Sequence, residues 1–164
     1  MKVLRPFSDE TGSQMVEFGL VLLPLMAVVF LIMDIAWVCF AQATLQHAVQ
    51  VGVRAAISQS VPASFSGQDA YVKSVVQHTA MGFLKGESGL GEIWIKYYSP
   101  TNLSVAISGA NSNAGGNIIQ VSVANVPVPT LCPLLRTDWA TVFMKATASD
   151  IMESPSPQTG LPTR

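Results

Sequence analysis

The chain has 164 residues, of which 49% are hydrophobic and only 12% are charged. Ordinary soluble domains carry about 25% charged residues, so this deficit indicates a chain that lies partly in lipid or packs within an assembly. The net charge is −1 and no basic block is present, which argues against nucleic acid as a partner.

The first twelve residues, MKVLRPFSDETG, place Lys2 and Arg5 ahead of a long apolar stretch. Lys and Arg favour the cytoplasmic side of a membrane. We therefore expect the N-terminus to stay in the cytoplasm and everything after a membrane span to lie outside.

The apolar stretch runs from Gly12 to about Ala43, and its part from Phe18 to Met33 carries no charge. A bilayer core of about 30 Å needs roughly 20 apolar residues in a helix. Because lipid offers no hydrogen-bond partners, an inserted segment of this kind is a helix. The sequence thus predicts a transmembrane helix.

Three kinds of N-terminus remain open. The first is a permanent single-span anchor. The second is a secretory signal cut at the A-x-A site Ala41–Ala43, although the apolar run is longer than the usual 7–15 residues or so. The third is a pilin-type leader, which needs a small residue at the cut and an acidic residue just inside the helix. Gly12, Ser13 and Glu17 supply both.

This stretch resembles the TadE/TadF-like minor pseudopilins of the tight-adherence (Flp) type IV pilus system. The resemblance rests on GSQMVEF at 12–18, on Asp34, and on AQATLQHAVQVGVRAA at 41–56. One departure is that Trp37 and Val38 follow Asp34, where the family often has Arg or Lys.

The resemblance implies cleavage by a prepilin peptidase between Gly12 and Ser13, in a single-pass protein of the bacterial inner membrane. It implies that Glu17 pairs with the freed amine of a neighbouring subunit and sets axial register. The alternative for Glu17 is an interfacial carboxylate favoured by the helix dipole. Implied partners are lipid, the peptidase, other pilins and inner-membrane assembly proteins, with no cofactor.

The helical pattern continues from Glu17 to Ile57, which is about 60 Å and twice the bilayer core. Small and apolar residues recur at helical spacing in its second half, and small residues let helices approach closely. This half either packs among other pilin helices or packs on its own domain, and the two are compatible. The helix-packing candidates, including a proline that can kink the span, are Pro24, Ala48, Gly52, Arg54 and Ala55.

Asp34 lies about 25 Å beyond Glu17 along the helix, near the expected outer edge of the membrane. It either bonds a partner helix or reaches water, and Trp37 fits an interfacial anchor. Cys39 and Cys132 either form a disulfide that ties the helix to the outer domain or remain two unpaired thiols.

After a linker at 61–67, residues 69–84 predict a second helix and 86–91 a glycine-rich turn. Alternating patterns at 93–98, 103–107 and 119–123 predict strands, and 141–150 predicts a last one. The segment 126–129, with its two prolines, is expected to leave the sheet.

The predicted fold is α+β, with a long N-terminal transmembrane helix that continues into a pilin-like outer domain with a second helix and a small antiparallel sheet. The expected divisions are a cytoplasmic leader (1–12), the helix (13–60), the outer domain (61–153) and a disordered tail (154–164). No nucleophile elbow, carboxylate pair or metal spacing indicates an enzyme. The alternative functions are an uncleaved single-span protein that displays a periplasmic binding domain, and a domain secreted after Ala43.

Overall fold

The computed structural model describes residues 10–109, 111–131 and 141–153. The chain is α+β, as predicted. Its elements, in order, are α1 (Glu10–Ile57), α2 (Gln68–Thr79), α3 (Gly86–Gly91), β1 (Ile93–Ser99), β2 (Asn102–Ile107), β3 (Ile118–Pro129) and β4 (Thr141–Ile151). The expected leader lies mostly outside the described residues, and the expected tail and Cys132 lie wholly outside them.

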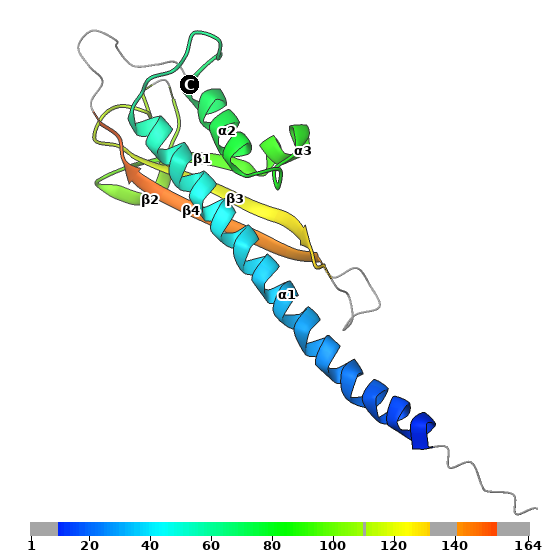
Figure 1. The fold of residues 1–164 in the computed structure, drawn as a ribbon. Helices are drawn as coiled ribbons and strands as arrows, with labels where there is room; N and C mark the ends of the chain where they lie inside the picture. The colour runs from blue at the N-terminus through cyan, green and yellow to red at the C-terminus, as the bar shows by residue number, and fades with distance from the viewer. Residues whose placement is uncertain (1–9, 110, 132–140, 154–164) are drawn as a thin grey trace, which may run out of the picture.

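The four strands form one antiparallel sheet in the order β2-β1-β3-β4. Figure 1 shows the C-terminal half of α1 lying against this sheet with α2 beside it, while the N-terminal half extends away from the domain. The domain therefore has two layers, helices on one side and the sheet on the other. Only one half of the long helix belongs to it.

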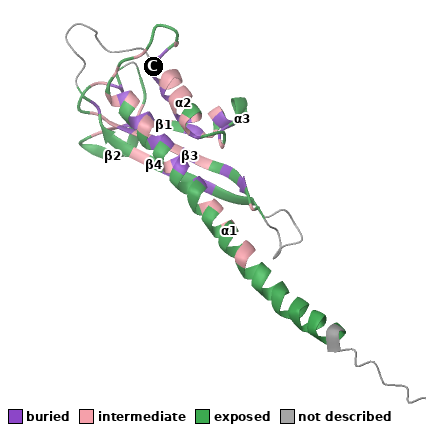
Figure 2. Ribbon diagram, viewed as in Figure 1, coloured by how far each residue is buried: buried purple, intermediate pink, exposed green. Residues whose placement is uncertain are grey.

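The core lies between these layers, because α1, α2, β1, β3 and β4 each bury one face (Figure 2). Helix α1 contributes small and apolar side chains at helical spacing, and the strands contribute alternate residues, as their sequence patterns predict. The core residues with no exposed surface include Ala41, Leu45, Ala48, Val49, Ala56, Val72, Val76, Ala80, Tyr97, Ile119, Val121 and Val128.

Gly52 sets how closely α1 approaches α2. A Cβ atom at this position would lie 2.3 Å from Cγ2 of Val76, a side chain that is itself fully buried. Real Cβ contacts are never so short, and Val76 is β-branched and stiff. Only glycine therefore fits here without a shift of the two helices.

The prediction that residues 126–129 leave the sheet is wrong. Val126 to Pro129 continue β3 and pair with Met144 to Thr141 of β4, after a bulge between Val123 and Val126. Strand β1 ends its pairing at Val123, so beyond that point β3 has a strand on one side only. Pro127 and Pro129 are two positions apart, so both turn toward the edge without a strand, where no N–H is needed.

Two local boundaries also differ from the sequence-based expectation. Helix α2 ends at Thr79 rather than Leu84, because the chain turns through positive φ values at Met81 and Gly82. Residues 86–91, expected as a turn, form the short helix α3, with Gly89 packed against the backbone of Leu84.

Strand β2 was predicted correctly, but its apolar residues are not buried. Leu103 and Val105 remain 62% and 63% exposed. The helices contact β1, β3 and β4, so the helical layer stops short of this edge strand. Strand β4 forms as predicted, with Met144 and Ala146 on its buried face.

Candidate functional site

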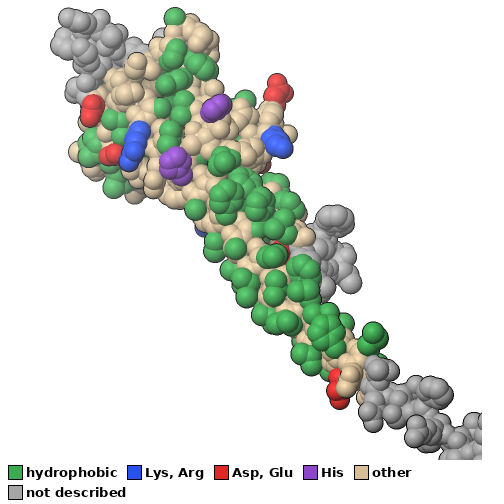
Figure 3. Space-filling view, in the orientation of Figure 1, with side chains coloured by type: hydrophobic (Ala, Val, Ile, Leu, Met, Phe, Trp, Pro, Cys, Tyr) green, Lys and Arg blue, Asp and Glu red, His purple; other side chains and the backbone are tan. Residues whose placement is uncertain are grey.

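The N-terminal half of α1 is an apolar surface that no described part of the chain covers. Figure 3 shows hydrophobic side chains along the whole of this segment. Residues such as Leu20 and Leu23 are 72% and 74% exposed. Among the described residues, α1 is long and apolar enough to cross a membrane, and its most apolar window is entirely unburied. Such a surface requires lipid or other protein as its surroundings.

The residues of the predicted cleavage site lie at the start of this surface. Gly12 and Ser13 are exposed and helical, and a Cβ atom added to Gly12 would have no neighbour within 4 Å. Glu17 lies one turn beyond Ser13, also exposed. Because residues four apart share a helix face, Glu17 and Ser13 lie on the same side of α1. Pro24 lies farther along, exposed, and α1 continues through it.

Asp34 and Trp37 join the exposed half of α1 to the end of the sheet. The backbone N–H of Leu131 donates to Oδ1 of Asp34 over 2.8 Å. One turn along, Nε1 of Trp37 donates to the carbonyl oxygen of Pro129 over 3.1 Å. Asp34 thus has a partner within its own chain. Its predicted role toward another helix or the membrane interface stays a prediction.

An aromatic cluster lies beside this junction. The ring of Trp37 stacks on Phe40 with centroids 5.9 Å apart, and Phe83 contacts both rings at 5.8 and 6.5 Å. Phe83 comes from the loop between α2 and α3. The cluster therefore links the point where α1 meets the domain to the rest of the helical layer.

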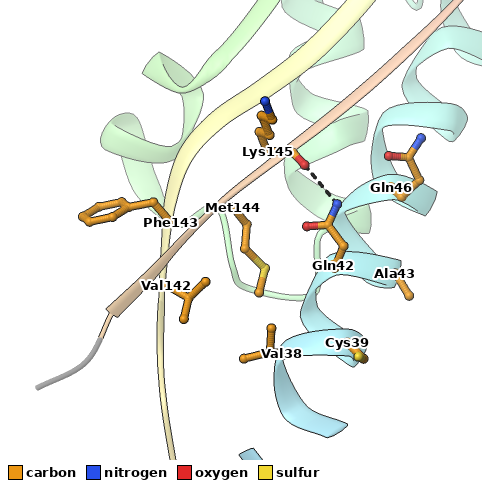
Figure 4. Close-up of a pocket in the computed structure, with 9 residues that line it drawn as sticks. All are labelled: Val38, Cys39, Gln42, Ala43, Gln46, Val142, Phe143, Met144 and Lys145. Atoms are coloured by element: carbon orange, nitrogen blue, oxygen red, sulfur yellow. Dashed lines mark hydrogen bonds between the residues drawn. The ribbon is translucent and has the colours of Figure 1, made fainter. Parts of the chain in front are cut away.

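Two glutamines of α1 bond the edge strand β4. Nε2 of Gln42 donates to the carbonyl of Lys145 over 3.0 Å, and Nε2 of Gln46 donates to that of Thr147 over 3.1 Å (Figure 4 shows the first). Four helical residues rise about 6 Å and two strand residues about 6.6 Å, so the periods match. The glutamines satisfy carbonyls of an edge strand that another chain could otherwise pair with.

A groove of about 700 Å³ lies between α1 and β4 at the same level. In Figure 4, Val142 and Met144 point toward Val38 across this groove, whereas Phe143 points away from α1. The groove is mostly apolar and contains no cluster of ionisable groups. Within the described residues, no group of three or more His, Cys, Asp or Glu side chains could hold a metal ion.

A buried amide cluster at the far end of α1 was not predicted from the sequence. Nε2 of Gln68 donates to the carbonyl of Ala56, and Nδ2 of Asn113 donates to Oε1 of Gln68, over 2.8 and 2.7 Å. Gln59 bonds the carbonyls of Asn113 and Glu153. No local pattern indicates this cluster, because the repeated asparagine in the loop at 109–117 is typical of a simple turn.

The other predicted packing residues are found in different surroundings. Ala48 and Gly52 are buried within their own chain, Arg54 is exposed and Ala55 is half-buried. Cys39 is exposed, and because Cys132 lies outside the described residues, the disulfide stays a prediction.

Comparison with known proteins gives a family match. Residues 12–54 match the family model described as TadE-like protein. The match begins at the predicted cut and ends within the last turn of α1. No curated protein and no solved structure matches the chain.

Proposed function

We propose, from the TadE-like helix of residues 12–54, that this protein is a minor pilin-like membrane protein that takes part in assembly of a tight-adherence (Flp) type IV pilus. One observation carries the proposal. The part of the chain with the family match includes the whole apolar surface of α1 that the domain leaves uncovered. A helix of this kind can exchange lipid for neighbouring helices, as pilus assembly requires.

In this proposal the leader stays in the cytoplasm, α1 spans the inner membrane and the α+β domain faces the periplasm. Prepilin peptidase cuts between Gly12 and Ser13. Glu17, a carboxylate that is costly in hydrocarbon, then pairs with the freed amine of Ser13 on a neighbouring subunit. The pairing compensates both charges and sets the axial register of the helices.

The protein would act by helix packing and not by catalysis. Its partners are the peptidase, other pilins or pseudopilins, and inner-membrane assembly proteins. The exposed span of α1 is the surface that these partners share, in lipid before assembly and among helices afterwards. The hydrogen bonds from Gln42 and Gln46 to the edge of β4 support assembly through helices, because they hinder pairing of this strand with a strand of a neighbour.

One observation favours a second candidate, an uncleaved single-span protein that displays its domain in the periplasm. Helix α1 begins at Glu10, so the bond between Gly12 and Ser13 lies in helical backbone. Helix ends fray easily, and a peptidase would need the first turn to open. A chain that keeps this turn closed would remain an anchor.

The test compares Glu17→Ala with Glu17→Gln and with Glu87→Ala as a matched control in the short exposed helix α3. Each variant replaces the native chain in the bacterium that makes this protein. The amount of the variant in the membrane fraction and the amount of pili sheared from the cells are then measured. We expect all three to be membrane-bound, the two Glu17 variants to lose piliation and the control to keep it. Normal piliation with Glu17→Ala would contradict the role of this carboxylate.

A further inference from the structure

The end of the sheet nearest to the exposed span carries its own exposed apolar side chains. Leu131, which follows β3, is 61% exposed, and Phe143 of β4 is 68% exposed. Val142, which lines the groove between α1 and β4, is 38% exposed. These three residues are here called the apolar rim. They lie where β3 ends and β4 begins, which is the end of the domain from which α1 emerges (Figure 1).

Hydrogen bonds fix the level of the apolar rim along α1. Leu131 is bonded to Asp34, and Pro129, which pairs with Thr141 of β4, is bonded to Trp37. Twenty helical residues rise about 30 Å, the thickness of the hydrocarbon core. If the hydrocarbon layer begins at a residue between Ser13 and Glu17 of α1, it therefore ends at a residue between Met33 and Trp37. The rim is held at that level.

We propose that the apolar rim rests on the outer surface of the bilayer, so that the protein contacts lipid through α1 and again through the end of its sheet. The inference rests on the membrane span of the proposed function. It adds a second contact, made by residues outside the family match.

The outer face of β4 has the polarity that a lipid interface demands. Phe143, Lys145, Thr147 and Ser149 alternate on one side of the strand, and all four are exposed. With distance from the span, this part of the face goes from apolar to cationic to neutral polar, and the exposed Ile151 follows at the far end of the strand. A lysine above an apolar residue can place its ammonium among lipid phosphates while its stem covers the apolar layer.

Lipid fits the rim better than a second copy of this chain. Phe143 points away from α1 (Figure 4), and Leu131 is bonded to Asp34, below which the exposed span begins. Two membrane contacts joined by Asp34 and Trp37 would fix the depth and rotation of α1 before assembly.

The test places a single cysteine with an environment-sensitive NBD label at three exposed positions of the full chain, with Cys39 and Cys132 replaced by serine. Phe143→Cys reports on the rim. Ile151→Cys is the matched control, because it lies on the same face of β4, is 58% exposed and stands about 26 Å farther along the strand, away from the span. Leu25→Cys reports insertion of α1. The protein is reconstituted in phosphatidylethanolamine–phosphatidylglycerol vesicles that carry spin-labelled lipid.

We expect labels at 25 and 143 to shift their emission to shorter wavelength and to lose intensity to the spin-labelled lipid, and the label at 151 to behave as in water. Quenching at 25 alone would overturn the inference and leave the span intact. A wavelength shift at 143 without lipid quenching would assign the rim to a second protein copy, which also overturns it. No quenching at 25 would refute the span itself, and with it both proposals.

Discussion

The two halves of α1 share one continuous backbone but have different surroundings. In the half that extends from the domain, large apolar residues such as Leu23 are exposed, at 74%. In the half that packs on the sheet, small residues such as Ala48 and Gly52 face α2 and the strands. A helix satisfies its own backbone in either place, so the side chains alone decide its surroundings.

This difference separates the residues of α1 that stabilise the domain from those that act in membrane insertion and assembly. Changes in the packed half should act on the free energy of unfolding of the domain. Changes in the exposed half should leave that free energy unaltered and act on membrane insertion or on packing with other subunits. Matched substitutions in the two halves can therefore test this difference.

The largest effect is expected from leucine truncation. Leu45→Ala removes a fully buried side chain and should cost about 2–5 kcal/mol of unfolding free energy. Leu23→Ala, the same change at a 74% exposed position, should leave that value unchanged. Denaturant unfolding of the detergent-solubilised protein measures both. Equal losses would mean that the span is packed on its own domain.

A bulky residue at Gly52 should also destabilise the domain, whereas one at Gly19 should not. Gly52→Leu forces a side chain against Val76 and should destabilise the domain by about 1–3 kcal/mol. Gly19→Leu has open space around it and serves as the control. Thermal unfolding compares them, and a Gly52→Leu protein as stable as the native one would refute the close approach of α1 and α2.

Asp34 lies between the two halves and should have an intermediate effect. Asp34→Ala removes the acceptor for the N–H of Leu131 and should cost about 1–2 kcal/mol, because a partly exposed charge contributes less than a buried one. Asp34→Asn keeps an oxygen acceptor and should recover much of the loss. Identical unfolding of the Ala and Asn variants would show that the bond does not stabilise the junction.

The smallest effect is expected at the glutamines that bond β4. Gln46→Ala should cost about 0.5–1 kcal/mol and speed hydrogen exchange in β4, since one edge carbonyl loses its donor. Gln50→Ala, one turn along and exposed, is the control. Exchange that is equally fast in both variants would argue against a specific role for Gln46.

The sequence predicted the elements whose patterns are local. The alternation of Ile119, Val121 and Val123 predicted a strand with one buried face, and the structure buries all three. The stripe that includes Leu45 and Ala48 predicted a packed helix face in the same way. In such segments the period of apolar residues alone identifies the element and its inner side.

The sequence did not predict features that depend on which segments meet. Pro127 and Pro129 argued against a strand, and only the early end of β1 makes them compatible with β3. The bonds from Gln42 and Gln46 need a strand that runs along α1 at a matching period. The Gln68–Asn113 pair joins residues far apart in the chain. None of these carries a local signal.

Processing and membrane insertion are tested most directly by the N-terminus of the protein from native membranes, determined by intact mass and terminal sequencing. We predict a chain that starts at Ser13, with Glu17 as its fifth residue. A chain that retains Met1 would contradict processing and leave a permanent anchor. A chain that starts at Thr44 would contradict the membrane span itself.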